Sequence, residues 1–363
     1  MSLRAGRLLL GAALACAACS PREIEDQRRR VLESWGEHVL LANYAAFEAG
    51  TIELESRAAL LCEGPSEEAL EAAREAWWSA RGAWKRAEVF AFGPYQDTPW
   101  RLGPKIDFWP ARPESIEAVL SSEEPLTLGQ IELLGAAAKG LPVAEYLLYA
   151  REAEPLAAFT EAPRRCEYLR AVSADLVARA GEIRRAWDPE HENYLGELVD
   201  AGRSSRAFAS LHTALGEVVN RMAFTLENIQ ADKLGKPLGV GSGGSPQPEL
   251  AESPFSGRSV EDVRDNLRGI EALFFDDPAS GAVGLDHYLR TRGRHFAKRM
   301  RAAIDACDRA LVAIDAPLTE AVSSDPAAVE AAIARAGELQ RLIQVDVINA
   351  LSLTVSFNDN DGD

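Results

Sequence analysis

Residues 163–187 read PRRCEYLRAVSADLVARAGEIRRAW and predict one long amphipathic helix. The apolar side chains of this stretch recur at steps of three and four residues, at Leu169, Val172, Leu176, Ala180, Ile183 and Trp187. That spacing places them on one face of an α-helix, with most of the charged residues elsewhere. Such a helix needs other elements against which to bury its apolar face.

Helical patterns extend over most of the remaining chain. Within 22–49, Val31, Trp35 and Val39 recur every fourth residue, and 66–90 begins with Ser66 followed by acidic residues, a helix-start signal. Further long helices are predicted over 127–149, 204–231, 259–275, 293–314 and 326–352. Alternating β-branched runs are scarce. The sequence therefore predicts an all-α fold.

Two stretches interrupt the helices. Residues 91–113 form a Pro/Gly/aromatic loop whose Trp100 and Trp109 must pack against the protein. Residues 235–257 are rich in Gly, Ser and Pro and predict a flexible surface loop. Long helices with connecting loops on either side of 189–200 suggest two bundles. We expect an N-terminal bundle over 30–188 and a C-terminal bundle over 189–363.

Composition excludes several classes of protein. The chain has 363 residues, a net charge of −17 and 47% hydrophobic residues, enough for a substantial core. This negative charge argues against nucleic acid as a partner. It also argues against a polybasic protein surface that binds an anionic membrane, because both kinds of binding require positive protein charge. Beyond the N-terminus, no apolar run approaches the length of a membrane span.

The N-terminus predicts export. Arg4 and Arg7 precede the short apolar stretch 8–15, and small residues and cysteines follow. We expect a lipoprotein signal peptide over 1–18, an acylated Cys19 (or Cys16) and a tether over 19–29. The alternative is simple cleavage that leaves a secreted protein. The lipoprotein prediction implies a membrane-anchored, periplasm-facing protein, and Ser20 after Cys19 favours the outer membrane.

Three cysteines remain after export. Cys62 and Cys166 lie in the same half of the chain, and an exported protein allows a disulfide between them. Cys307 lies in an Ala-rich helical run and predicts a buried free thiol. The five histidines form no His-x-x-x-His pair, and none has an acid three residues later. No serine-hydrolase elbow, P-loop or dinucleotide fingerprint occurs.

Several longer stretches together resemble the imelysin family, also called insulin-cleaving metallopeptidase-like or iron-regulated-protein-like. Each is a weak signal alone, but their order and spacing match over roughly 30–363. They are AWWSARGAWKRAEVFAFGP (76–94), IDFWPAR (106–112), KGLPVAEYLLY (139–149), ADKLGKPLG (231–239), ESPFSGRSVEDVRDNLRGIEALF (252–274) and LQRLIQVDVINALSLTVSFNDNDGD (339–363).

The resemblance implies two four-helix-bundle-like halves, pseudo-duplicated and packed side by side, in the cell envelope, with a pocket between them. Members of the family typically carry Gly-x-His-x-x-Glu, whose His and Glu are candidate metal ligands or catalytic groups. The matching stretch here runs from Gly140 to Glu145, and Pro142 replaces the histidine. Because proline offers no ligand atom and no base, peptidase activity becomes less expected, and Pro142 suits the first turn of a helix.

The resemblance leaves a candidate ligand pocket of six residues. These residues are Glu145, Asp107, Trp109, Glu88, Arg258 and Pro142. The metal ligands and the cofactor stay unknown, with a metal ion as one candidate. Glu145 lies in an apolar run, so it is either functional or paired with an arginine such as Arg101, Arg112 or Arg258. Asp107 and Trp109 can equally anchor their loop. Arg258, beside a helix start, either binds an anionic group or pairs with an acid of the other bundle.

The sequence as a whole predicts a lipid-anchored, non-catalytic envelope protein that binds a small or metal-containing ligand in iron or other metal uptake. The metal link rests on the resemblance. Two alternatives stay open: a divergent metallopeptidase-like enzyme, and a scaffold that docks an envelope redox protein. A cluster of His and carboxylate groups would favour the enzyme, and an exposed apolar patch with Trp100 or Trp109 would favour the scaffold.

Overall fold

The computed structural model describes residues 20–149 and 155–354 and is built from helices. Within these residues the one extended pairing is an isolated bridge between Asp277 and Ala282. The predicted all-α fold is confirmed. Across the same residues, none of the helices is both long enough and apolar enough to span a bilayer. The predicted signal peptide and both candidate lipidation sites, Cys16 and Cys19, lie outside the described residues.

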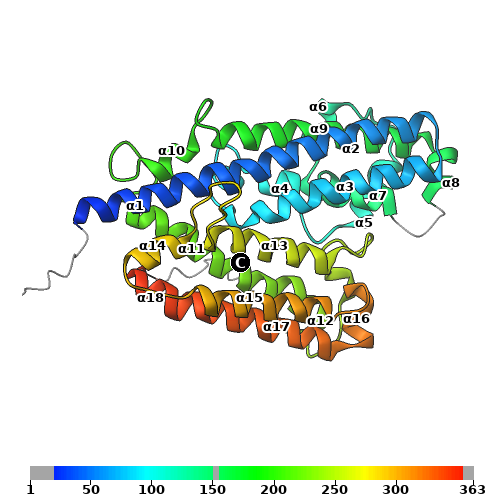
Figure 1. Cartoon of the computed structure of the whole chain (residues 1–363). Helices are drawn as coiled ribbons and strands as arrows, with labels where there is room; N and C mark the ends of the chain where they lie inside the picture. Colours follow the sequence, from blue (N-terminus) through cyan, green and yellow to red (C-terminus); the bar gives the residue numbers. More distant parts are fainter. Residues whose placement is uncertain (1–19, 150–154, 355–363) are drawn as a thin grey trace, which may run out of the picture.

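The first half of the chain forms the upper layer in Figure 1, around three long helical segments. The first is continuous through a π-helical turn, so the helix predicted over 22–49 extends to residue 63 because Leu54, Ala58 and Leu61 continue its buried face. The elements of this half are α1 (Pro21–Ser34), η1 (Trp35–Leu41), α2 (Ala42–Glu63), α3 (Glu67–Ala87), η2 (Glu88–Phe90), η3 (Gly93–Tyr95), α4 (Gly103–Ile106), α5 (Pro113–Leu120), α6 (Leu128–Leu133), η4 (Ala136–Ala138), α7 (Leu141–Tyr149), α8 (Pro155–Glu161), α9 (Pro163–Trp187) and α10 (Tyr194–Val199).

The second half forms the lower layer, and α1 also packs on it through α11 and α14. Two further π-helical turns, η5 and η7, interrupt its long helices. The elements of this half are α11 (Leu211–Asn228), η5 (Ile229–Gly235), α12 (Lys236–Leu238), η6 (Pro248–Leu250), α13 (Ser259–Phe274), α14 (Leu285–Thr291), α15 (Ala297–Val312), α16 (Leu318–Ser324), α17 (Pro326–Arg341), η7 (Leu342–Val347) and α18 (Ile348–Leu351).

Two predicted helices are wrong in extent. The helix predicted over 127–149 is broken into α6, η4 and α7, because Gly140 takes a φ of +85° and approaches the backbone of Ile106 closely. A Cβ at Gly140 would lie 2.3 Å from the Ile106 carbonyl oxygen. The helix predicted to start at 204 starts at Leu211, where Ser210 caps it by accepting from the Thr213 N–H.

The stretch 235–257 is only partly the surface loop that its composition predicts. Its middle, 240–246, is largely exposed, but Ala251, Glu252 and Ser253 at its end are buried. These buried residues lead directly into α13. The segment thus delivers polar side chains to the interior at the junction of the two layers.

The two layers meet most closely where α3 lies against α13. Two glycines permit the approach: a Cβ at Gly269 would lie 2.4 Å from the Arg86 carbonyl oxygen, and a Cβ at Gly82 would lie 2.8 Å from Arg258. The contact requires glycine at position 269, because the nearest atom there is backbone, whereas a Cβ at position 82 would displace the ends of the Arg258 and Asp265 side chains. The close approach brings charged side chains of the two helices together.

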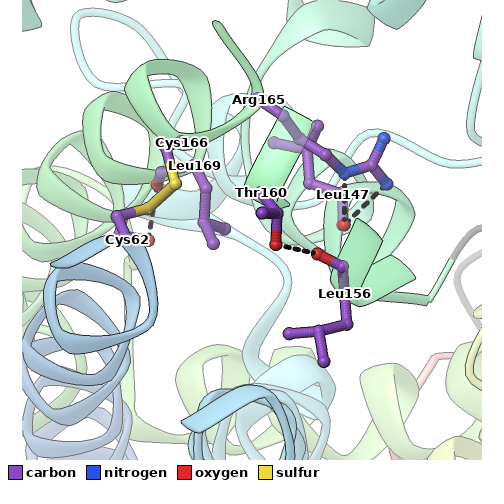
Figure 2. The surroundings of a disulfide bond; sticks show 8 residues. Cys62, Leu147, Leu156, Thr160, Arg165, Cys166 and Leu169 are labelled. Carbon is purple, nitrogen blue, oxygen red and sulfur yellow. Dashed lines mark hydrogen bonds between the residues drawn. A yellow bond between two sulfur atoms is a disulfide. The ribbon is translucent and has the colours of Figure 1, made fainter. Parts of the chain in front are cut away.

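A disulfide joins the end of α2 to the start of α9 (Figure 2). It links Cys62 to Cys166, the two cysteines expected to pair, while Cys307 is a buried free thiol. Beside it, Arg165 donates to the Leu147 carbonyl oxygen at 2.7 and 2.9 Å. The disulfide and the arginine together hold the start of α9 against α2 and α7.

We predict that removing the disulfide destabilises the protein strongly. The bond closes a segment of 104 residues, and loop-closure entropy for about 100 residues corresponds to about 4–5 kcal/mol of unfolding free energy. The variant C62S/C166S should lose about that amount in urea unfolding. Reductant should destabilise the wild type and leave the variant unchanged; equal sensitivity of both proteins to reductant would contradict the prediction.

Candidate functional site

A buried network of ion pairs fills the junction of α3, α13 and the segment before α13. Its cations come from both halves of the chain, and so do its acids. The cations are Arg81, Lys85, Lys233 and Arg258, and the acids are Glu88, Asp107, Glu252, Asp262 and Asp265. Buried charges are tolerated only when they are paired, and here each has an opposite charge within ion-pair distance.

Arg81 is the centre of this network. Its guanidinium lies 2.5 Å from an oxygen of Asp107, 3.1 Å from Asp262 and 3.2 Å from Glu252, and its side chain is 1% exposed. Burial alone would lower the pKa of Arg81, but the three carboxylates outweigh it and raise that pKa well above its usual value. The same neighbours hold Asp107 ionised: burial opposes its charge, yet Arg81 and Lys85 lower its pKa.

A second group of partners surrounds Lys233, which the π-helical turn η5 carries into the interior. Its Nζ lies 2.7 Å from Glu88 and donates to Asn266 Oδ1 at 2.8 Å. Burial opposes ionisation of Glu88, but Lys233 and Lys85 outweigh it and lower the pKa of Glu88 to about 2. Glu88 is therefore a charged structural partner at neutral pH.

Arg258 pairs with its own helix. It contacts Asp262 and lies 2.7 Å from Asp265, both on α13, and its guanidinium stacks 4.8 Å from the Trp78 ring. Of the two alternatives for Arg258, the ion pair with an acid of the other bundle is wrong, because both acids lie in its own half of the chain. Because both acids neutralise Arg258, it is not positioned to bind an anionic ligand.

Glu145 lies at the edge of the network and holds a loop. Its Oε1 accepts from the backbone N–H of Phe255 at 3.0 Å, from that of Ser256 at 2.8 Å and from the Ser256 hydroxyl at 2.7 Å. Of the two alternatives for Glu145, the ion pair with Arg101, Arg112 or Arg258 is wrong, because among the described residues none of these arginines lies within ion-pair distance of its carboxylate. The loop donors occupy it instead.

Burial gives Glu145 an unusual pKa. The side chain is 1% exposed, and desolvation raises its pKa to about 7, against the lowering effect of the Ser256 hydrogen bonds and of Arg81. Pro142 lies one turn earlier, buried in the first turn of α7, as expected of a proline there. Near neutral pH, Glu145 is therefore divided between its neutral and charged forms.

A pocket of about 590 Å³ opens beside this loop, between the two halves of the chain. Tyr146 and Phe255 meet there edge to face at 5.0 Å. The lining combines residues before and after the chain midpoint: Pro110, Ala111, Pro113, Glu114, Tyr146, Pro248, Glu249, Leu250, Pro254, Phe255 and Thr319. Its size and its apolar character are those of a small-molecule site.

The six predicted pocket residues lie in different parts of the structure. Glu88, Asp107 and Arg258 belong to the ion network, and Glu145 and Pro142 lie on α7 behind the pocket wall. Trp109 precedes the lining residue Pro110; its Nε1 is buried and, among the described residues, has no hydrogen-bond partner. None of the six lines this pocket. Trp100 packs edge to face on Tyr194, as its loop was expected to pack.

Sequence reasoning missed the centre of the network and the wall of the pocket. Arg81, Lys85 and Lys233 lie in Ala- and Leu-containing helical stretches that read as ordinary amphipathic helices. One signal was available: Arg81 and Lys85 are four residues apart, on the same face as Trp77 and Trp84, where charges are expensive. Phe255 gave no such signal.

These groups do not fit a resident metal ion at the position of the family motif. Pro142 has no ligand atom, one oxygen of Glu145 already accepts three hydrogen bonds, and the nearby acids are neutralised by arginine and lysine. Across the described residues, no three or more His, Cys, Asp or Glu side chains gather in a way that could hold a metal. The arrangement is suited to holding two halves and a loop in place.

We predict that Arg81→Met destabilises the protein by about 3–5 kcal/mol, because it leaves Asp107, Asp262 and Glu252 buried with too few partners. Urea unfolding measures the change. The control is Arg335→Met, which breaks an ion pair with Glu338 whose side chains are 50% and 52% exposed. That change should cost about 0–1 kcal/mol, and equal losses in the two variants would contradict a central role for Arg81.

We also predict a pH dependence that comes from Glu145. Its pKa is about 7 in the folded protein and 4.5 ordinarily, so between these values the unfolded chain releases a proton that the folded chain retains. Stability should therefore fall as pH rises through this window, by up to about 3 kcal/mol. In Glu145→Gln this fall should be absent. Parallel urea unfolding series would refute the prediction if both proteins showed the same slope.

Comparison with known proteins places this architecture among relatives. The peptidase M75 family model, described as imelysin, matches residues 40–345. Iron-regulated protein A of Synechococcus elongatus is 25% identical over 320 residues, covering 86% of this chain and 83% of that protein.

Two solved structures share the fold. The first is a putative iron-regulated protein A precursor from Parabacteroides distasonis, with a TM-score of 0.76 and 21% identity, covering 93% of this chain and 96% of its own. The second, an imelysin-like protein from Psychrobacter arcticum, has a TM-score of 0.74 and 20% identity over 92% and 98%. With the family model matching most of its length, the chain belongs to the imelysin family.

Proposed function

We propose that this imelysin-family protein is a non-catalytic binding protein of the cell envelope that holds a small or metal-containing ligand in the pocket between its two halves. It works in the uptake of iron or another metal. The observation that carries the proposal is the pocket of about 590 Å³ formed jointly by α5, α7, the 248–255 segment and Thr319. Pockets at the junction of two structural units are common ligand sites.

The wall of the pocket is held in place from behind. Phe255 lines the pocket, and its backbone N–H is bound to Glu145, whose neighbour Tyr146 lines the same pocket. The Glu145 carboxylate thus joins α7 to the segment before α13. A preformed site of this kind loses little free energy to ordering when a ligand binds.

The iron-related part of the proposal rests on relatives. The Synechococcus and Parabacteroides proteins carry names that say iron-regulated, and a role in iron acquisition is the direct extension of such regulation. Lipid attachment at Cys19 or Cys16 and an outer-membrane, periplasm-facing location are proposed from the N-terminal sequence. An envelope redox protein is an alternative partner, also proposed from the sequence.

The chemistry of the site favours binding over hydrolysis. A metallopeptidase needs an open metal position and a base, and here Pro142 replaces the family histidine while Glu145 is occupied by loop donors. The remaining acids carry fixed counter-charges. No group among them has both a poised proton and a free approach to a substrate.

The test is to identify what the protein carries. The mature chain is purified from its native envelope, denatured, and its released molecules are measured by mass spectrometry and elemental analysis. We expect a stoichiometric ligand that Phe255→Ala loses, because the substitution removes one ring of the pocket. The matched control is Phe275→Ala, which deletes a phenyl ring that lies against Arg301 outside the pocket.

Two results would overturn the proposal. One is a ligand retained equally by Phe255→Ala and the control. The other is a stoichiometric metal that disappears in Glu145→Gln together with peptide hydrolysis, which would establish a metallopeptidase in spite of Pro142.

A further inference from the structure

We propose that the pocket between the halves selects an organic cation: an apolar or aromatic body that carries an ammonium group. The inference rests on the proposed ligand-binding function and names the chemical class of the ligand. It follows from three features of the pocket: its charge, its aromatic rings and its rigid apolar walls.

The charge of the lining is one-sided. Glu114 of α5 and Glu249 of η6 line the pocket, one from each half, and none of the lining residues is Lys, Arg or His. Within the described part of the chain neither glutamate makes an ion pair, unlike the acids of the buried network. Two carboxylates without counter-charges attract a cation and repel an anion.

The nearest arginines in the sequence do not neutralise this charge. Arg112 lies between two lining residues, yet its guanidinium stacks on the Phe108 ring at 5.2 Å and takes no part in the lining. Arg258, three residues after Phe255, is held by Asp262 and Asp265. Both cations are thus committed elsewhere.

The aromatic pair supplies a second attraction for a cation. Tyr146 and Phe255 meet edge to face at 5.0 Å within the lining, and aromatic faces bind ammonium groups through their quadrupoles. The Tyr146 hydroxyl donates to Glu117 at 2.6 Å. This hydrogen bond to a carboxylate increases the electron density of the ring and so strengthens its attraction for a positive group.

The walls fit an apolar body. Four prolines and Leu250 contribute to the lining, and proline fixes its own φ angle, so these walls change little in shape. A volume of about 590 Å³ admits a molecule of drug-like size. An inorganic cation alone would leave the apolar wall without a partner, so the ligand carries both a charge and a hydrophobic part.

The test compares three small probes on the full mature protein by isothermal titration calorimetry. They are benzyltrimethylammonium, the neutral N,N-dimethylbenzamide and the anionic phenylacetate. We expect the cation to bind most tightly and phenylacetate most weakly. Added salt should weaken the cation selectively, since exposed carboxylates are screened.

The deciding variant is E114Q/E249Q, which removes both carboxylates and keeps the shape of the pocket. It should weaken the cation by about fivefold or more and leave the neutral probe within about twofold. The matched control is E190Q/E330Q, which removes the same net charge from exposed positions outside the lining. Thermal melting of both variants confirms that they fold, as substitutions at exposed sites should allow.

The outcomes distinguish the inferred preference for an organic cation from the proposed ligand-binding function. A cation preference that E114Q/E249Q loses and the control keeps supports the inference. Equal binding of all probes, or a preference that survives in E114Q/E249Q, overturns it, while loss of all binding in Phe255→Ala would still support a ligand pocket. Absence of binding by every probe also overturns it, and the co-purification experiment then decides the proposed function independently.

Discussion

The ion pairs around Arg81 are the constraint on which the rest of the molecule depends. One guanidinium, buried between α3 and α13, is neutralised by Asp107 from a loop, Glu252 from the segment before α13, and Asp262 on α13 itself. Two of these three carboxylates come from the second half of the chain, so the full set of ion pairs forms only when the halves pack together. These pairs hold the two halves against each other, and the glycines at the crossing of α3 and α13 make room for the close contact.

Such a network defines position more than it adds free energy. Removing two or three charges from water costs about as much as their pairing returns, whereas breaking one member of a set is expensive. Its value here lies in fixing how the helices pack: Lys233 on η5 and Arg81 on α3 reach partners in the other half of the chain only in one arrangement of the helices. That arrangement also sets the two walls of the pocket.

Glu145 connects the network to the pocket. In the family pattern this position stands three residues after a histidine, and the pair suggests metal chemistry. With Pro142 in place of the histidine, the glutamate holds the Phe255–Ser256 backbone instead. One carboxylate, desolvated and close to Arg81, thereby keeps an aromatic wall in place, and its raised pKa is a consequence of that burial.

Much of the fold could be predicted because its signal is local. Apolar residues at steps of three and four predict α9, the helix-start signal at Ser66 predicts α3, and α13 matches the helix predicted over 259–275, so the all-α class follows from local patterns. Errors came where long-range contacts override local preference. Gly140 breaks a predicted helix because the Ile106 backbone lies against it, and the Gly-rich stretch ends in buried residues because the ion network needs Glu252.

The sequence by itself determined most of the helices, the family and the replacement of the motif histidine by Pro142, since each of these depends on residue types and their spacing alone. It also marked Glu88, Asp107 and Arg258 as candidate pocket residues. Only the tertiary structure decided what those charges do, because a buried charge is defined by its partners, and the pairs that join the two halves are 145 to 181 residues apart in the sequence. The pocket likewise depends on the tertiary structure, because Tyr146 and Phe255 become neighbours only when the two halves pack.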